Sequence, residues 1–252
     1  MRVHQQPSYV LLNRPYSETS WIVEVFSRDF GRLALMAKGA RRIKSKLKGT
    51  LLPFQPLLLS WTGKGEIPTL TSAEIDQADF NLIEHELLGD DLVCGFYCNE
   101  LMVNLLHRHD PHKSLFDHYH STIMSLARSK LDSSSAQVLR EFEKTVMKET
   151  GYEVNFHFEA GGQTPINAQD FYRYQSNQGF VRTPGSQHAA FSGRVIQLLA
   201  LGFNDSSPSL NSMGAFTNQE VSQAKQLMRD ILSQTLGYKQ IVSRELFYPK
   251  NR

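Results

Sequence analysis

Five short runs of β-branched and aromatic residues in the first 75 residues limit the fold more than any other feature of this sequence. In the second run, Trp21, Val23 and Val25 fall on one face, because successive side chains of a strand point to opposite sides. The segment RPYSE is expected to form a turn, and the two glycines of TGKGE suit a tight hairpin. The predicted strands are Ser8–Asn13, Thr19–Ser27, Arg32–Lys38, Pro56–Trp61 and Ile67–Ile75. Short strands at this spacing predict a small closed or nearly closed barrel of OB-fold size.

From Asp76 onward apolar residues recur three or four positions apart, as in the pairs Leu92 and Phe96 and Leu101 and Leu105, which predicts helices. Gly151 is expected just after one helix, and Thr217 begins a predicted capping box ahead of another. Residues 152–187 lose this period and contain turn signals with two short runs typical of strands. The predicted fold class is therefore α+β, with a five-stranded OB-fold barrel over residues 1–78. A mostly helical domain over residues 79–252 carries the irregular insertion at about 152–187.

Composition describes an ordinary globular protein of 252 residues, with 40% hydrophobic and 21% charged residues. No signal peptide is recognised at the N-terminus, and no apolar run reaches the length of a membrane span. Cys94 and Cys98 lie four positions apart in a predicted helix and are interpreted as two buried thiols rather than as a disulfide. These features predict a cytoplasmic monomer that does not associate with membranes.

The positive charge is concentrated in one segment, although the whole chain has a formal net charge of only +2. Residues 1–80 contain eleven Lys and Arg against seven Asp and Glu. Within KGARRIKSKLKG, six cations fall in eleven residues with no acidic residue between them: Lys38, Arg41, Arg42, Lys44, Lys46 and Lys48. This segment connects the third and fourth predicted strands, beside the binding face of an OB-fold barrel. It is either a surface that binds a polyanion or a solvated loop that keeps the chain soluble.

Nucleic-acid binding also needs stacking groups and further cations outside this segment. Most aromatic residues near the barrel are expected in its core, whereas Tyr16, close to Arg14, is expected to be exposed. Lys64, at the tip of the predicted glycine hairpin, is a further candidate cation. Arg14, Tyr16 and Lys64 therefore join the basic segment as candidate DNA-binding residues.

Catalytic and metal-binding motifs were not found in the sequence. The Cys94–Cys98 spacing lacks a second cysteine pair, and the paired histidines lie two apart, so that on a helix they point in different directions. There is no GxxxxGK[ST] phosphate loop and no GxSxG motif. We therefore predict no catalytic residue, no metal and no cofactor. Grooves between the helices could dock an acidic or aromatic peptide, with Arg140 available to meet its carboxylate.

The segments RPYSETSWIVEVFSRDFGRLALMAKGARR and LKGTLLPFQPLLLSWTGKGEIPTLTSAE strongly resemble the N-terminal domain of the bacterial RecO recombination mediator family, and GYKQIVSREL resembles its C-terminal segment. The resemblance implies a protein that is not an enzyme, that binds single- and double-stranded DNA and that anneals complementary strands. It also implies help in loading RecA onto DNA coated with single-strand-binding protein. The implied partners are RecR and the acidic, phenylalanine-ended tail of the single-strand-binding protein, and the implied location is the nucleoid.

One departure from that family concerns zinc. Many members carry a four-cysteine zinc site in the segment that here runs from His157 to Phe180, which contains no cysteine. The chain resembles the zinc-free members, and His157 and Glu159 are interpreted as structural residues. Two other classes remain open from the residues alone: a scaffold whose basic barrel binds an acidic protein, and a DNA-modifying enzyme.

Overall fold

The computed structural model describes residues 1–80, 86–128, 134–184, 190–201 and 217–247. Its contacts divide the chain into two compact units, Met1–Val138 with Ile241–Arg252, and Leu139–Gln240. The first unit therefore contains the barrel, the helices that follow it and a returning C-terminal segment. The predicted boundary at residue 78 stays a prediction. The segment FNDSSPSLNSMGAF, residues 203–216, is predicted from its sequence to be a loop and lies outside the described residues.

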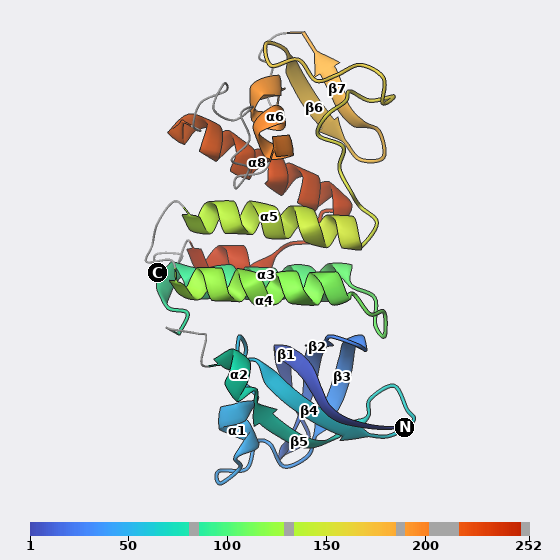
Figure 1. The fold of residues 1–252 in the computed structure, drawn as a ribbon, viewed down its shortest axis with the longest axis vertical. Coiled ribbons are helices and arrows are strands. Elements are labelled where there is room, and N and C mark those ends of the chain that lie inside the picture. The colour runs from blue at the N-terminus through green and yellow to red at the C-terminus, as the bar shows by residue number, and fades with distance from the viewer. Residues whose placement is uncertain (81–85, 129–133, 185–189, 202–216, 248–252) are drawn as a thin grey trace. The chain divides into compact units, whose positions relative to one another are not determined.

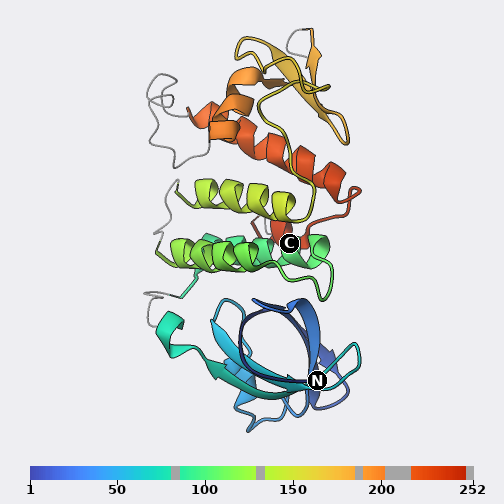
Figure 2. The same ribbon diagram turned by 45° about the vertical axis from the view of Figure 1, so that its right-hand side comes forward.

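A closed five-stranded barrel forms the N-terminal part of the first unit, as predicted (Figure 1). Its strands are ordered β1-β2-β3-β5-β4. Their bounds are β1 Arg2–Tyr16, β2 Ser20–Ser27, β3 Gly31–Ala37, β4 Leu57–Thr62 and β5 Thr69–Ile75. The ring that they form is seen in Figure 2. A short helix, α1 (Leu47–Thr50), lies between β3 and β4.

Closure of the barrel depends on the length of β1, whose first half pairs with β4 and whose second half pairs with β2. The register with β2 shifts between Val10 and Leu12, so the strand bends there. The expected turn at RPYSE was partly wrong: Arg14, Pro15 and Tyr16 continue β1 and pair with β2. Pairing with β2 holds these residues extended, and the turn is confined to Ser17–Thr19.

Alternation along β2 places its side chains on both sides of the barrel wall. Val23 and Val25 are fully buried in the barrel core, together with Leu33, Leu35, Leu57, Leu59 and Trp61. On the outer face, Glu24 and Phe26 are also buried. Phe26 contacts Phe116 with ring centroids 5.5 Å apart, so the outer face of this strand is covered by a helix.

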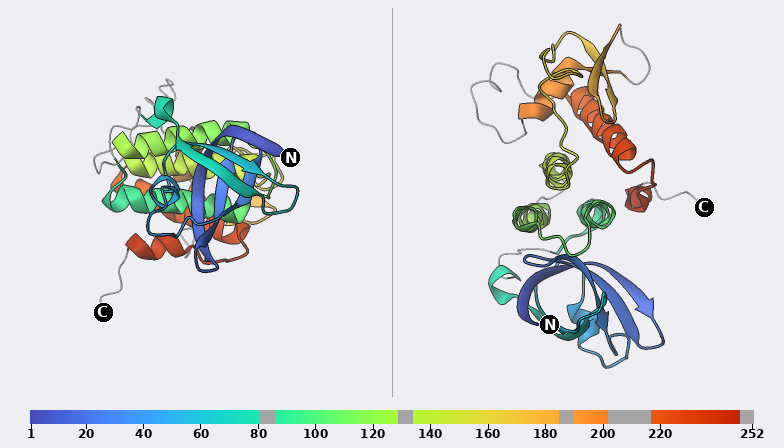
Figure 3. Two further views of the ribbon diagram at one scale, coloured as in Figure 1. Left: turned by 90° about the horizontal axis from the view of Figure 1, so that it is seen from below. Right: turned by 90° about the vertical axis from the view of Figure 1, so that its right-hand side faces the viewer.

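The covering helices are α3 (Gly89–Leu105) and α4 (Lys113–Arg128), which follow the short α2 (Gln77–Phe80). Figure 3 shows α3 and α4 end-on, side by side against the barrel. The buried Asn99 amide donates to the carbonyls of Val10 (3.4 Å) and Leu11 (3.1 Å) at the bend of β1, and Tyr119 Oη donates to Asn99 Oδ1 at 2.7 Å. Burial raises the pKa of Tyr119 well above its ordinary value, so the phenol remains a donor.

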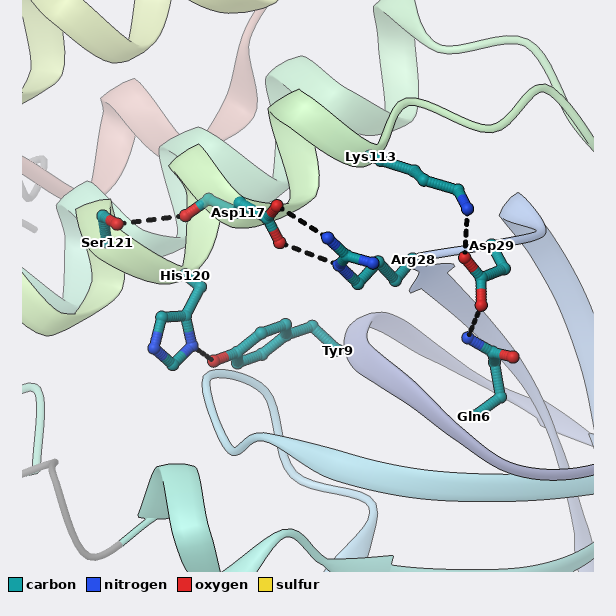
Figure 4. A network of polar contacts seen from close by, with 8 residues as sticks. All are labelled: Gln6, Tyr9, Arg28, Asp29, Lys113, Asp117, His120 and Ser121. Atoms are coloured by element: carbon teal, nitrogen blue, oxygen red, sulfur yellow. Dashed lines mark hydrogen bonds and ion pairs between the residues drawn. The ribbon is translucent and has the colours of Figure 1, made fainter.

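A polar network joins the β2–β3 turn to α4 (Figure 4). Arg28 donates two hydrogen bonds of 2.9 Å to Asp117, and Lys113 lies 2.8 Å from Asp29. The hydrogen bond from Arg28 lowers the pKa of Asp117, and that from Lys113 lowers the pKa of Asp29. Nearby, Tyr9 Oη and His120 Nδ1 are 2.7 Å apart. The β2–β3 end of the barrel is thus fixed to the helices.

A buried acidic residue is part of the same junction. Glu24 is 3% exposed, bonds to Arg108 and lies 3.5 Å from Arg32 Nε. Arg32 also donates to the backbone carbonyls of Val103 and Leu106 at the end of α3, at 2.5 and 2.8 Å. A buried carboxylate needs such partners, because an unpaired charge in the interior is costly.

The second unit contains most of α5 (Ser134–Glu149), with α6 (Gly193–Leu201) and α8 (Asn218–Thr235) and a small sheet ordered β7-β6-β8. These strands are β6 Phe171–Gln175, β7 Gly179–Thr183 and β8 Phe191–Ser192. The predicted capping box is confirmed, with Glu220 N–H donating to Thr217 Oγ1 at 3.2 Å. Gly151 follows α5 with a φ of +81°, as expected for a helix C-terminus.

Side-chain and backbone hydrogen bonds hold the irregular insertion. Tyr172 is buried, and its hydroxyl accepts from the Asn167 N–H at 2.9 Å and donates to Glu159 at 3.1 Å. Phe180, also buried, contacts the rings of Phe156 and Tyr174. The insertion therefore has a small core of its own.

The C-terminal segment belongs to the first unit, where a 3₁₀ helix, η1 (Val242–Phe247), packs on α3. The Glu100 carboxylate accepts from the backbone N–H groups of Val242 and Ser243, both at 2.8 Å. One acidic side chain thus caps this helix and ties it to α3.

Candidate nucleic-acid interface

The six cations of the basic segment are all exposed, and the structure places them directly after β3. Gly39 has a φ of +70°, which lets the chain turn away from the sheet. Two hydrogen-bonded turns follow. In the first, Arg42 N–H donates to Gly39 C=O (3.1 Å), and in the second, Ser45 N–H donates to Arg42 C=O (3.0 Å). We call residues 38–49 the basic loop. In the part of the chain that the structure describes, none of its cations forms an ion pair.

Arg41 fastens the basic loop to the β1–β2 turn. Its backbone N–H donates to Thr19 C=O at 2.9 Å, and its guanidinium donates to Ser17 C=O at 2.7 Å. Arg14 and Tyr16, at the end of β1, therefore lie on the strand that leads into the turn next to the loop. Both are exposed, Tyr16 by 51%, as predicted for this tyrosine.

Lys64 lies on the β4–β5 hairpin, which reaches the same end of the barrel. The hairpin is placed there by the hydrogen bond from Met36 N–H to Pro68 C=O at 2.8 Å and by the pairing of Met36 with Thr69. Lys64 is exposed. Three connections thus meet near the end of β3: the β1–β2 turn, the basic loop and the β4–β5 hairpin.

This end of the barrel is the one that the helices leave open. Since β2 and β3 are antiparallel, the turn that contacts α4 and the basic loop lie at opposite ends of the hairpin. In Figure 1, α1, which ends the basic loop, is on the side of the barrel away from α3 and α4. Cations attract phosphates most strongly where several of them lie close together without acidic partners, as they do on the basic loop.

The aromatic residues of the barrel only partly follow the expected division. Trp61 is buried in the barrel core, whereas Phe26 and Phe54 are buried outside it, against rings from α4 and α3. Tyr16 is exposed beside the cations, where a base could stack on its ring. The sequence did not indicate two features of this surface: the clamp made by Arg41, and the side chain of Ile43, which is 98% exposed.

Arg140 lies elsewhere, in the second unit, and its environment differs from the expected open groove. Its side chain is 9% exposed and lies 2.8 Å from Glu143, whose side chain is fully buried. The Arg140 Nη1 atom is buried and has no hydrogen-bond partner among the described residues. A hollow of about 570 Å³ in the same unit is lined by Lys144, Lys148, Phe156 and Phe158, among others, and Arg140 is not among its lining residues.

In the described ranges, no three His, Cys, Asp or Glu side chains are grouped so that they could hold a metal ion. Cys94 and Cys98 are buried and are not joined by a disulfide. Over the same parts of the chain, no helix is both long enough and apolar enough to cross a membrane.

A closed five-stranded barrel with unpaired cations gathered on the loops at one end is typical of OB-fold proteins that bind nucleic acid. Comparison with known families makes this more specific. Residues 1–78 match the family model of the recombination protein O N-terminal domain, and residues 89–245 match that of its C-terminal domain. The chain belongs to the RecO family of DNA repair proteins.

Individual relatives agree over nearly the full length. The chain is 39% identical over 251 residues to the DNA repair protein RecO of Thiobacillus denitrificans, covering 97% of this chain and 91% of the relative. It is 40% identical over 246 residues to the protein of the same name from Dechloromonas aromatica, covering 98% and 96%. With that of Nitrosococcus oceani, the identity is 40% over 248 residues, covering 98% and 93%.

Proposed function

We propose that this protein is a recombination mediator that binds single- and double-stranded DNA through the open end of its barrel and anneals complementary strands. The observation that carries the proposal is the convergence of the basic loop with the turns near Tyr16 and Lys64. The contact residues are Arg14, Tyr16, Lys38, Arg41, Arg42, Lys44, Lys46, Lys48 and Lys64. Their exposure, and the lack of ion pairs on the basic loop in the described structure, support this role.

The mechanism follows from charge neutralisation. Cations on the loop bind the phosphates of two strands, so the repulsion between the strands falls and their bases can pair. Phosphate contacts carry no base information, so these contacts form on DNA of any sequence. No bond is made or broken in this process, and it needs neither a nucleotide nor a metal.

The proposal includes partners and a location. The protein works with RecR on DNA coated with single-strand-binding protein, and RecA loads onto the strand afterwards. We keep the division at residue 78, with the barrel holding DNA and the helical part holding protein partners. The protein acts as a monomer in the cytoplasm, at the nucleoid, where its DNA is found.

Annealing of two complementary oligonucleotides precoated with their single-strand-binding protein tests the main proposal. Wild type is compared with a variant in which Arg41, Arg42, Lys44 and Lys46 become Ala. A charge-matched control changes four exposed cations outside the barrel to Ala: Arg128, Arg173, Lys225 and Lys239. We expect wild type and control to anneal without nucleotide, and the loop variant to lose annealing while remaining folded.

Salt dependence adds a quantitative check. Four loop–phosphate contacts contribute roughly −3 to the log–log salt slope of single-strand binding, so the slope should be less steep by about that amount in the loop variant. Equal annealing by the loop variant and wild type would place the DNA elsewhere. Failure of the wild type to bind any DNA would instead favour a scaffold that binds an acidic protein. Divalent-metal-dependent change of a labelled strand would indicate an enzyme.

A peptide site for the acidic tail of the single-strand-binding protein is proposed in the second unit. Two places are supported: the unpartnered Nη1 of Arg140, and the hollow in which Lys148 lies near two phenylalanines. We expect the tail peptide to bind at least about tenfold more tightly than the same peptide with an amidated C-terminus, because a charge-assisted contact is lost. Measuring both peptides by fluorescence anisotropy against Arg140→Lys and Lys148→Ala shows which place is used. Equal binding of the free-acid and amidated peptides would contradict a carboxylate contact.

A further inference from the structure

Ile43, in the middle of the basic loop, has the most exposed large hydrophobic side chain in the described structure. It is 98% exposed, compared with 77% for Tyr238 and 70% for Leu88. A single exposed apolar residue is common on protein surfaces. Full exposure of an isoleucine whose two neighbours in the chain are Arg42 and Lys44, however, places an apolar group within a cluster of cations. The fold of the barrel makes no use of this side chain.

The backbone holds Ile43 at the tip of a defined turn. The hydrogen bond from Ser45 N–H to Arg42 C=O makes Ile43 and Lys44 the two central residues of that turn. The preceding turn and the two bonds of Arg41 to Ser17 and Thr19 fasten its base. Because a β-branched side chain has few χ1 rotamers, the isoleucine is a stiff projection from a supported loop.

An apolar side chain among cations has a known use on DNA. Proteins that bend or open DNA neutralise phosphates with Lys and Arg and insert Ile, Leu, Phe or Met between neighbouring bases. The basic loop has both parts, since Arg42 and Lys44 flank Ile43 in the chain and can bind phosphates on either side of one base step. No other residue of the loop is apolar and fully exposed.

We propose that Ile43 inserts between adjacent bases of DNA whose phosphates are bound by the basic loop, and that it unstacks them. The inference rests on the proposed function, because the loop must bind DNA for its tip to reach the bases. Insertion should favour flexible pyrimidine–purine steps such as TA, where unstacking costs least. A strand opened in this way presents its bases for pairing while its phosphates stay bound.

The test uses the full chain and DNA with 2-aminopurine, whose fluorescence rises when it leaves the stack, placed within a TA step. Wild type is compared with Ile43→Ser and Ile43→Leu, and Val242→Ser serves as the control. Val242 is also exposed, by 61%, in the same unit but outside the barrel. Thermal melting by circular dichroism confirms that each variant is folded.

We expect wild type, Ile43→Leu and Val242→Ser to raise the fluorescence and Ile43→Ser to leave it at the level of free DNA. Affinity of Ile43→Ser should fall about threefold to tenfold, the scale of one partly buried aliphatic side chain. Its salt slope should equal that of the wild type, because no phosphate contact is removed.

Each outcome separates this inference from the function on which it rests. If wild type binds with the expected salt slope but Ile43→Ser gives the same fluorescence, the insertion is wrong and DNA binding by the loop stands. Tight binding by wild type without a rise in fluorescence also overturns the insertion. If wild type binds no DNA, both proposals fall together.

Discussion

Residues of one type serve different purposes within the basic loop. Arg41 uses its guanidinium and its backbone N–H to hold the β1–β2 turn, whereas Arg42, its neighbour, forms no hydrogen bond to that turn in the described structure. Counting charges in the sequence treats the two arginines as equal. The structure indicates that Arg41 positions the loop in addition to any contact with phosphate.

Conservative substitution separates these two purposes. Arg41→Lys keeps the charge but loses the planar fork that reaches Ser17 C=O, so we expect the loop to become more mobile. Hydrogen exchange of the backbone amides at residues 41, 42 and 45 should be at least about threefold faster, which corresponds to the loss of a weak exposed hydrogen bond. Arg42→Lys, the matched control, should leave these rates unchanged. Equal exchange rates in both variants would mean that the clamp contributes nothing.

At the scale of elements, the polar network between the β2–β3 turn and α4 makes stability depend on acidity. The pKa values of Asp117 and Asp29 are lowered in the folded protein by their bonds to Arg28 and Lys113. A lowered pKa means that each Asp carboxylate binds a proton less readily in the folded state than in the unfolded chain, where the pKa of an Asp is about 3.9. This stabilisation is complete above that pH and is lost as the pH falls through the folded pKa.

We therefore expect the urea midpoint of the protein to fall between about pH 4 and pH 2, and to fall less steeply in Asp117→Asn. Asn cannot titrate, so the part of the slope that comes from Asp117 disappears. Glu66→Gln, which changes an exposed carboxylate on the β4–β5 hairpin, should keep the wild-type slope. Added salt should reduce the difference between wild type and Asp117→Asn, since the pair is exposed. A steeper slope in Asp117→Asn would contradict this assignment.

Elements with a clear local pattern could be predicted, whereas those set by distant contacts could not. The alternation in β2 correctly placed Val23 and Val25 on one face, and the structure buries that face in the barrel core. It gave no sign that Glu24 and Phe26, on the other face, are buried beneath helices that come much later in the sequence. Likewise, the Arg-Pro-Tyr of RPYSE looks like a turn locally, but pairing with β2 keeps those residues extended.

The same limit applies to the candidate site. The run of cations from Lys38 to Lys48 was evident from the sequence, because it depends only on adjacent residues. Lys64 and Tyr16 lie at the same end of the barrel because of the order of its strands. This order could not be predicted from the sequence. The insertion shows another case: the hydrogen bonds of Tyr172 to Glu159 and Asn167 join residues that no sequence motif connects.

At the scale of the whole molecule, the chain leaves the first unit at Val138 and returns to it at Ile241. Glu100 holds the returning segment by accepting from two backbone N–H groups. We expect Glu100→Ala to lower the free energy of unfolding by about 1 to 2 kcal/mol, the scale of a lost helix cap. Urea unfolding measures this change, and limited proteolysis should show faster cleavage near residues 241–247.

Glu74→Gln provides the control, since Glu74 is an exposed carboxylate on β5. Its urea midpoint and its cleavage rate should both equal those of the wild type. Unchanged stability and unchanged cleavage in Glu100→Ala would show that η1 is held by its apolar contacts alone.

The return of the chain to its first unit also has a consequence for synthesis on the ribosome. The barrel and helices α3 and α4 emerge early, but the contact with η1 forms only after the residues beyond Ile241 have left the exit tunnel. The intervening unit, Leu139–Gln240, is complete by then and can fold first. The first unit is therefore the first to be synthesised in part and the last to be completed. A polypeptide released before residue 241 lacks η1 and its contact with α3.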